Sequence, residues 1–150
     1  MTPPTNAAWP WSSLGYVISG TEPWLGLGLT EGLSQAALKQ GFTLPTVVQV
    51  QAVPAILQGH DVLATSATGS GKTAAYVLPL LQQLAQAPTP VRQRPVRCLV
   101  LVPTRELASQ VSDLWHDLAR DLPVPMKVVT VFGGVSLNPQ MMRLRGGADV

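Results

Sequence analysis

The sequence has little of several features that mark common protein classes. It contains one cysteine, Cys98, which excludes an internal disulfide framework. Cys98 lies within an apolar run, so we expect a buried and unreactive thiol. No apolar stretch is long enough to span a membrane, and the N-terminus lacks the basic and apolar regions of a leader peptide. We therefore expect a cytoplasmic protein without a membrane segment.

Charge is also scarce. Charged residues make up 12% of the 150 residues, and the formal net charge of +2 is too small to indicate nucleic acid as a partner. The distribution of arginine is more informative, because no arginine precedes Arg92 and seven occur from there to Arg145. Any surface that binds a polyanion is therefore expected in the second part of the chain.

Helical and apolar segments alternate along most of the chain. Residues 1–23 have no regular pattern and are predicted to be a disordered tail. Helices are predicted over residues 30–40, 46–58, 72–87 and 104–121, and from an Asn138 cap with Pro139 first in the helix to Gly146-Gly147. Strands are predicted over 61–65, 96–102, 128–132 and from Ala148 to Val150. This order predicts an α/β protein with a doubly wound parallel sheet, whose ligands gather at the carboxyl ends of the strands.

The most informative stretch connects the strand predicted at 61–65 to the helix that begins at Lys72. Its residues are Ser66, Ala67, Thr68, Gly69, Ser70, Gly71, Lys72 and Thr73. Glycines between a strand and a helix allow backbone N–H groups to surround a phosphate at the positive end of the helix. Lys72 then reaches the outer phosphates, and the hydroxyl of Thr73 ligates Mg²⁺. The generic phosphate-loop pattern has glycine where this chain has Ser66.

Gln49 allows two interpretations. Thr46 followed by Gln49 three residues later fits a capping box, in which the glutamine side chain satisfies the backbone at the start of a helix. A glutamine amide can also pair with an adenine ring, and the nearby Phe42 could stack on that ring. The residues by themselves leave both interpretations open.

Several segments together resemble the DEAD-box RNA helicases. Residues 41–49 are similar to the Q motif of that family, residues 66–73 to its motif I, which often has a small residue in place of the first glycine, and residues 103–108 (PTRELA) to its motif Ia. Gly133-Gly134 is similar to its GG motif, and Trp24 occupies the place of its upstream aromatic residue. The resemblance covers about residues 24–150, with the motifs in the order and spacing of the family.

The resemblance implies a RecA-like fold, with a Q-motif region at 24–52 and part of the first helicase domain at 53–150. It implies that Gln49 and Phe42 bind the adenine of ATP and that residues 66–73 bind the phosphates and Mg²⁺. It further implies that RNA is bound through its backbone, independently of sequence, by Pro103, Thr104, Arg105, Gly133 and Gly134. Such contacts are sensitive to salt.

The sequence departs from the family in three respects. Val47 replaces a frequent proline, which removes some preorganisation of the first helical turn, and Trp24 replaces phenylalanine, which adds an indole N–H that needs a partner. The DEAD tetrapeptide and the second RecA-like domain of the family are absent from the 150 residues. We therefore expect a fragment of a longer helicase that does not hydrolyse ATP alone.

Two other functions remain as alternatives. The chain could be a different P-loop ATPase or a DNA helicase, although Gln49 with Phe42 favours selectivity for ATP. It could also be a non-catalytic module that binds RNA or a partner, or the product of a pseudogene.

Overall fold

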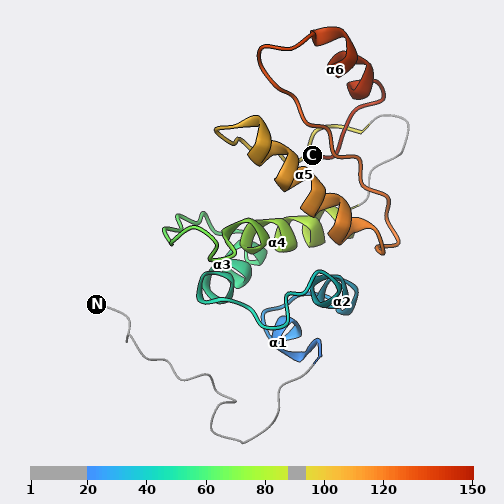
Figure 1. The fold of residues 1–150 in the computed structure, drawn as a ribbon. Helices are drawn as coiled ribbons and strands as arrows, with labels where there is room; N and C mark the ends of the chain where they lie inside the picture. Colours follow the sequence, from blue (N-terminus) through green and yellow to red (C-terminus); the bar gives the residue numbers. More distant parts are fainter. Residues whose placement is uncertain (1–19, 88–93) are drawn as a thin grey trace, which may run out of the picture.

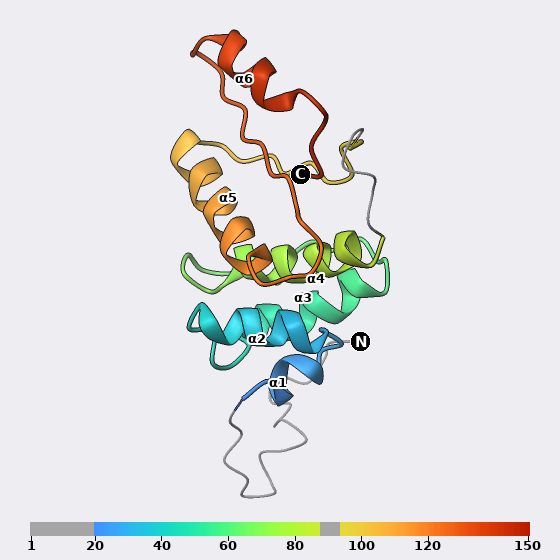
Figure 2. The same ribbon diagram turned by 90° about the vertical axis from the view of Figure 1, so that its right-hand side faces the viewer.

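A computed structural model describes residues 20–87 and 94–150. In this part of the chain the helices are α1 (Glu22–Leu25), α2 (Glu31–Lys39), α3 (Val47–Leu57), α4 (Lys72–Gln86), α5 (Arg105–Ala119) and α6 (Leu137–Leu144). Helices α1 to α4 lie together, α5 crosses over α4, and α6 lies at the opposite end of the molecule from α1 (Figures 1 and 2). The predicted tail falls mostly outside the described residues, and α1 begins at Glu22.

Two of the predicted helix ends are confirmed, and they have the same geometry. After α2, Gly41 has a φ of +81°, and the N–H groups of Gly41 and Phe42 donate to the carbonyls of Leu38 and Ala37. After α3, Gly59 has a φ of +80°, with equivalent bonds to the last turn. This is the Schellman arrangement, which requires a left-handed residue that glycine supplies without strain.

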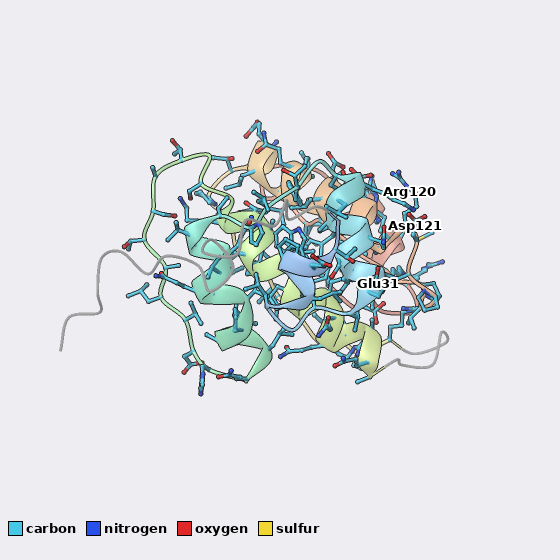
Figure 3. The ribbon with its side chains drawn as sticks, turned by 90° about the horizontal axis from the view of Figure 1, so that it is seen from below. Glu31, Arg120 and Asp121 are labelled. Atoms are coloured by element: carbon cyan, nitrogen blue, oxygen red, sulfur yellow. The ribbon has the colours of Figure 1, made fainter. Side chains whose placement is uncertain are left out.

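The core lies where α4 packs between α3 and α5. Val77, Leu78 and Leu81 of α4 are fully buried, as are Trp115 and Leu118 on the facing side of α5. The prediction that Trp115 belongs to the core is therefore confirmed. Helix α2 also contacts α5, and Glu31, Arg120 and Asp121 lie along the edge where these helices meet (Figure 3).

The predicted strands are not formed as strands in the described residues. Residues 61–65, 96–102, 128–132 and 148–150 are not assigned to any strand, and one isolated parallel bridge joins Arg94 to Gly147. A strand is stable only when its backbone groups are paired along a neighbour. Leu63, Leu99 and Leu101 are 96%, 76% and 84% exposed, so these apolar segments also lack cover on one face.

Parts of three of these segments nevertheless lie side by side. The carbonyl of Asp149 accepts hydrogen bonds from the N–H groups of Arg97 and Cys98, at 3.0 and 3.1 Å. The N–H of Asp149 donates to the carbonyl of Lys127 at 2.8 Å, and Val129 donates to Val150 at 2.9 Å. The segment at 148–150 thus lies between the segments at 94–98 and 127–129, in the side-by-side order of a sheet.

The predicted start of the last helix was wrong by two residues. Ser136, not Asn138, is the N-cap of α6, so Leu137 is the first helical residue and Pro139 is the third. Proline is tolerated at any position of the first helical turn, because the N–H groups there have no partner within the helix. The sequence pattern therefore did not distinguish between these two positions.

Candidate functional site

The phosphate loop leads directly into α4. Gly71 is the N-cap of this helix with a φ of +88°, and Gly69 has a φ of +75°. Both glycines are thus in the left-handed region that other residues rarely adopt. Lys72 and Thr73 form the first turn of α4, as predicted, so the positive end of the helix dipole faces the loop.

Lys72 is bound by the loop itself. Its ammonium group donates to the carbonyl of Ser66 at 2.5 Å and to the carbonyl of Ala67 at 2.7 Å. The hydroxyls of Ser66 and Ser70 are 2.7 Å apart and share a hydrogen bond across the same turn. An incoming phosphate would replace neutral carbonyl acceptors with charged ones, and charge-assisted bonds of this kind are stronger.

Gln49 connects the start of α3 to the phosphate loop. Its Oε1 accepts from the N–H of Thr46 at 2.8 Å, which is the glutamine half of the capping box. Its Nε2 donates to the carbonyl of Gly71 at 3.1 Å, and the side chain is only 2% exposed. An amide has two lone pairs and two N–H groups, so one of each remains for a further ligand. Sequence reasoning found the cap and missed the bond to Gly71.

Gly71 is required for this contact as well as for the turn. A Cβ atom at this position would lie 2.5 Å from Nε2 of Gln49 and 3.3 Å from the hydroxyl of Thr46. A distance of 2.5 Å is well inside van der Waals contact, so any side chain at residue 71 would displace Gln49. The phosphate loop and the start of α3 therefore form one packed unit.

Phe42 is bound to α1 and α2. It is partly buried against the core, and its carbonyl accepts a hydrogen bond from Nε1 of Trp24 at 2.9 Å. The extra indole N–H that the sequence carries at Trp24 is therefore satisfied. Hydrogen bonds join Gln49 to the phosphate loop, whereas those of Phe42 join it to the preceding helices α1 and α2.

The five residues predicted to bind RNA form a second cluster. Thr104 is the N-cap of α5, and its hydroxyl accepts from the N–H of Leu107 at 3.2 Å. Nη2 of Arg105 donates to the carbonyl of Gly133 at 2.5 Å, and a Cβ at Gly134 would lie 2.6 Å from the same atom. Pro103 precedes the cap, and with Thr104, Arg105 and Gly133 it lines a cavity of about 440 Å³ next to α5.

Sequence reasoning missed Gln140, which holds the other side of the Gly133-Gly134 turn. This buried residue of α6 accepts from the N–H of Phe132 at 2.7 Å and donates to the carbonyl of Phe132 at 3.1 Å. Its amide also reaches the carbonyl of Ser136 at 3.2 Å. A polar residue on a helix of mixed pattern gives no sequence signal for such a role.

Asp149 was also missed, although it organises the second part of the chain. This fully buried carboxylate forms ion pairs with Arg94 and with Arg97, the latter at 3.0 Å, and accepts from the N–H of Lys127 at 2.9 Å. Burial by itself would raise the pKa of Asp149, but the bonds from Lys127, Arg97 and Arg94 together outweigh it and lower the pKa below its ordinary value.

Cys98 is only partly buried, less than the sequence led us to expect. Burial nevertheless raises the pKa of its thiol above the ordinary value. The thiol therefore stays protonated at neutral pH, and a protonated thiol is a poor nucleophile.

The residues available for a metal ion are few. The described residues contain no group of three or more His, Cys, Asp or Glu side chains that could hold a metal. Thr73 is partly buried in the first turn of α4, and its hydroxyl suits Mg²⁺ as one oxygen ligand among phosphate oxygens and waters. In addition, no helix in the described residues is long and apolar enough to cross a membrane.

Comparison with known proteins connects the two clusters to a single family. The sequence model of the DEAD/DEAH box helicases matches residues 46–150, which include the phosphate loop, Arg105 and the Gly133-Gly134 turn. The chain belongs to this family. Its relatives include the ATP-dependent RNA helicase SrmB of Escherichia coli, which is 47% identical over 110 residues, covering 73% of this chain and 24% of the relative.

Another relative is the DEAD-box ATP-dependent RNA helicase RhpA of Helicobacter pylori, 42% identical over 76% of this chain and 22% of its own length. The chain therefore spans about a quarter of the length of these relatives.

Solved structures confirm the predicted fold class. A DEAD box protein from Methanococcus jannaschii superposes with a TM-score of 0.72 at 29% identity, covering 84% of this chain and 33% of that protein. The RNA helicase Prp28 of Chaetomium thermophilum, bound to ADP, gives 0.73 at 36% identity, covering 84% and 30%. The chain is thus a RecA-like α/β unit, although in the described residues the segments expected to be strands share only a few backbone hydrogen bonds and are not assigned as strands.

Proposed function

We propose that the chain provides the ATP-binding and RNA-backbone-binding elements of a DEAD-box ATP-dependent RNA helicase. The observation that carries this proposal is the hydrogen bond from Gln49 to the carbonyl of Gly71. It unites the residue that would select the base with the loop that would bind the phosphates. A nucleotide bound there would contact both elements, so one packed unit would bind the base and the triphosphate.

Each group at this site has a chemical role in the proposal. Lys72 leaves the carbonyls of Ser66 and Ala67 to bind the outer phosphates, and the N–H groups at the start of α4 complete the cradle. Gln49 offers its remaining lone pair and N–H to adenine, and Phe42 supplies an aromatic face. Mg²⁺, held in part by Thr73, would neutralise phosphate charge when bound.

The second cluster would hold the RNA backbone. The N-terminus of α5, the guanidinium of Arg105 and the N–H groups of the exposed residues Gly133 and Gly134 all suit phosphate oxygens. None of these groups reads a base, so the binding would be independent of sequence and weakened by salt. The second RecA-like domain of the family would complete this surface. We further propose that the 150 residues alone, which lack the DEAD tetrapeptide, do not turn over ATP.

Base selection tests the proposal most directly. Gln49→Glu retains an oxygen for the N–H of Thr46 and removes the N–H donors toward Gly71 and adenine, whereas Gln49→Ala removes both interactions. We expect both variants to weaken ATP binding about tenfold and GTP binding less, because the hydrogen bonds of Gln49 with adenine are lost for ATP only, whereas the lost bond to the loop affects both nucleotides. Affinities are measured by competition with a fluorescent ATP.

The matched control is Gln51→Ala, on an exposed position of the same helix, which should change neither affinity. If Gln49→Ala lowers the melting temperature but leaves the preference for ATP over GTP unchanged, Gln49 is only a helix cap and the proposed base site is wrong.

A further inference from the structure

The turn at Gly133-Gly134 carries backbone donors that are not used inside the molecule. The N–H groups of Gly133, Gly134 and Val135 make no hydrogen bond within the part of the chain that the structure describes, and all three residues are exposed. Gly134 has a φ of +71°, in the left-handed region. Arg105 donates to the carbonyl of Gly133, so its guanidinium lies next to these N–H groups.

Both ends of this segment are held by one side chain. Oε1 of Gln140 accepts from the N–H of Phe132 at 2.7 Å, and its Nε2 donates to the carbonyl of Phe132 at 3.1 Å. Nε2 also donates to the carbonyl of Ser136 at 3.2 Å. Phe132 comes directly before the turn, and Ser136 is the N-cap of α6. Gln140 therefore closes residues 133–135 into a short loop with both ends fixed.

Gln140 is not available to bind a ligand itself. A glutamine amide has two N–H donors, and the carbonyls of Phe132 and Ser136 use both of them. The side chain is only 5% exposed, and the lone pair that remains on its oxygen would repel the oxygens of a phosphate. Any effect of Gln140 on an anionic ligand must therefore act through the turn.

We propose that Gln140 is a positioning residue for the RNA backbone. Its three hydrogen bonds hold the turn in one conformation before RNA arrives, so that the N–H groups of Gly133 and Gly134 are already placed for phosphate oxygens. This inference rests on the proposed function, since it takes the turn as part of the RNA surface. Without Gln140, RNA would have to order two glycines, which have the greatest backbone freedom of all residues.

The test compares Gln140→Met with Gln82→Met in the 150-residue chain. Methionine keeps the length of the side chain and removes its hydrogen bonds. Gln82 is a matched control, because this buried residue of α4 also bonds a backbone N–H and a backbone carbonyl, those of Thr30 and Gly28 before α2. We expect Gln140→Met to weaken the binding of a fluorescein-labelled oligouridine about fivefold to thirtyfold, the cost of ordering the backbone of one residue. Gln82→Met should leave this affinity unchanged.

The salt dependence separates positioning from direct contact. If Gln140 preorganises the turn, the number of neutralised phosphates stays the same in Gln140→Met, and so does the slope of log affinity against log salt concentration. Arg105→Ala removes a cation and should reduce this slope by about 0.7. An equal reduction in Gln140→Met would mean that the Arg105 contact is lost instead, and the role in placing the glycine N–H groups would be wrong.

A second variant keeps the test decisive if Gln140→Met unfolds α6. In the methyl ketone isostere of glutamine, a methyl group takes the place of the side-chain NH₂. This replacement at residue 140 retains the acceptor for the N–H of Phe132 and removes both donors. It should weaken oligouridine binding about threefold to tenfold, the effect of one lost hydrogen bond, at nearly unchanged melting temperature. Unchanged oligouridine affinity would show that Gln140 only stabilises α6.

Arg105→Ala also separates this inference from the proposed function. If Arg105→Ala weakens oligouridine binding and neither Gln140 variant does, the positioning role of Gln140 is wrong and the RNA surface stands. If Arg105→Ala leaves oligouridine binding unchanged, the start of α5 and the adjacent turn are not an RNA surface, and both proposals are wrong.

Discussion

Residues 20–87 (the first half) and residues 94–150 (the second half) are held together by different kinds of interaction. The first half contains α1 to α4, whose backbone hydrogen bonds are made within each helix or at its ends. The second half contains α5 and α6 joined by segments whose backbone bonds depend on distant partners, such as Asp149 with Lys127 and Arg97. Local hydrogen bonds need no neighbouring strand, so the helices of the first half are well packed, whereas segments expected to be strands leave apolar side chains exposed, such as Leu63 in the first half and Leu99 and Leu101 in the second.

The largest expected effect is on the ion pairs of the second half. Asp149→Asn keeps the shape of the side chain but leaves the buried cations of Arg94 and Arg97 without a negative partner. Removing one member of a buried charge network costs about 3–5 kcal/mol. We expect amide hydrogen exchange to accelerate across 94–98, 127–129 and α6, while α3 and α4 keep their protection. An equal acceleration of amide hydrogen exchange in both halves would contradict the conclusion that the two halves are held together by different interactions.

Acid should act on the same group. Because the pKa of Asp149 is lower in the folded chain than in the unfolded chain, its contribution to stability is complete above the unfolded pKa. That contribution is lost as the pH falls below about 4, through the lowered folded pKa. In this pH range the amide hydrogen exchange of the second half, relative to its intrinsic rate, should therefore rise for the native chain. The rise should be smaller for Asp149→Asn.

A smaller effect is expected from two buried glutamines, one in each half. Gln82 of α4 donates to the carbonyl of Gly28 at 2.9 Å and accepts from the N–H of Thr30 at 2.7 Å, and Gln140 makes the similar pair of bonds to Phe132. Methionine keeps the length of both side chains and removes these bonds. Gln82→Met should lower the free energy of unfolding of the first half by about 1–2 kcal/mol.

Gln140→Met should instead act locally. We expect faster exchange at Phe132 and in α6 with little change in the main thermal transition, because α6 lies away from the packed helices (Figure 2). For both variants, calorimetry measures the thermal transition and site-resolved amide hydrogen exchange measures the local effect. A large drop in melting temperature for Gln140→Met alone would mean that the second half carries the stability of the whole chain.

Much of this division could be predicted from the sequence. The ends of α2 and α3 follow from Gly41 and Gly59, and the phosphate loop follows from its glycines between apolar and helical segments. Strands were predicted from local apolar patterns, but these patterns could not show whether the segments would pair. Pairing depends on neighbouring strands, about which a local pattern carries no information. Asp149 and Gln140 were not found for the same reason, since their partners are between 8 and 55 residues away, apart from the Ser136 carbonyl that Gln140 also reaches.

The smallest effect is expected where the two halves meet at the surface. Lys39 of α2 and Asp121, which follows α5, form an exposed ion pair at 2.5 Å along the edge shown in Figure 3. The hydrogen bond and the charge of Lys39 lower the pKa of Asp121. Water and salt screen such pairs, so Lys39→Ala should leave the melting temperature within error at physiological salt. A clear decrease would show that charge, and not the apolar contact of α2 with α5, joins the halves.

The position of Asp149 in the chain has a consequence for the order of folding. Asp149 is 55 residues from Arg94 and 52 residues from Arg97 along the chain, whereas Gln49 is three residues from its partner Thr46. Closing a long loop costs more entropy than closing a short one, and the cost precedes the gain from the contact. The helices of the first half can therefore form while the chain is still being synthesised, but the segments around Arg94 and Lys127 must wait until Asp149 has emerged.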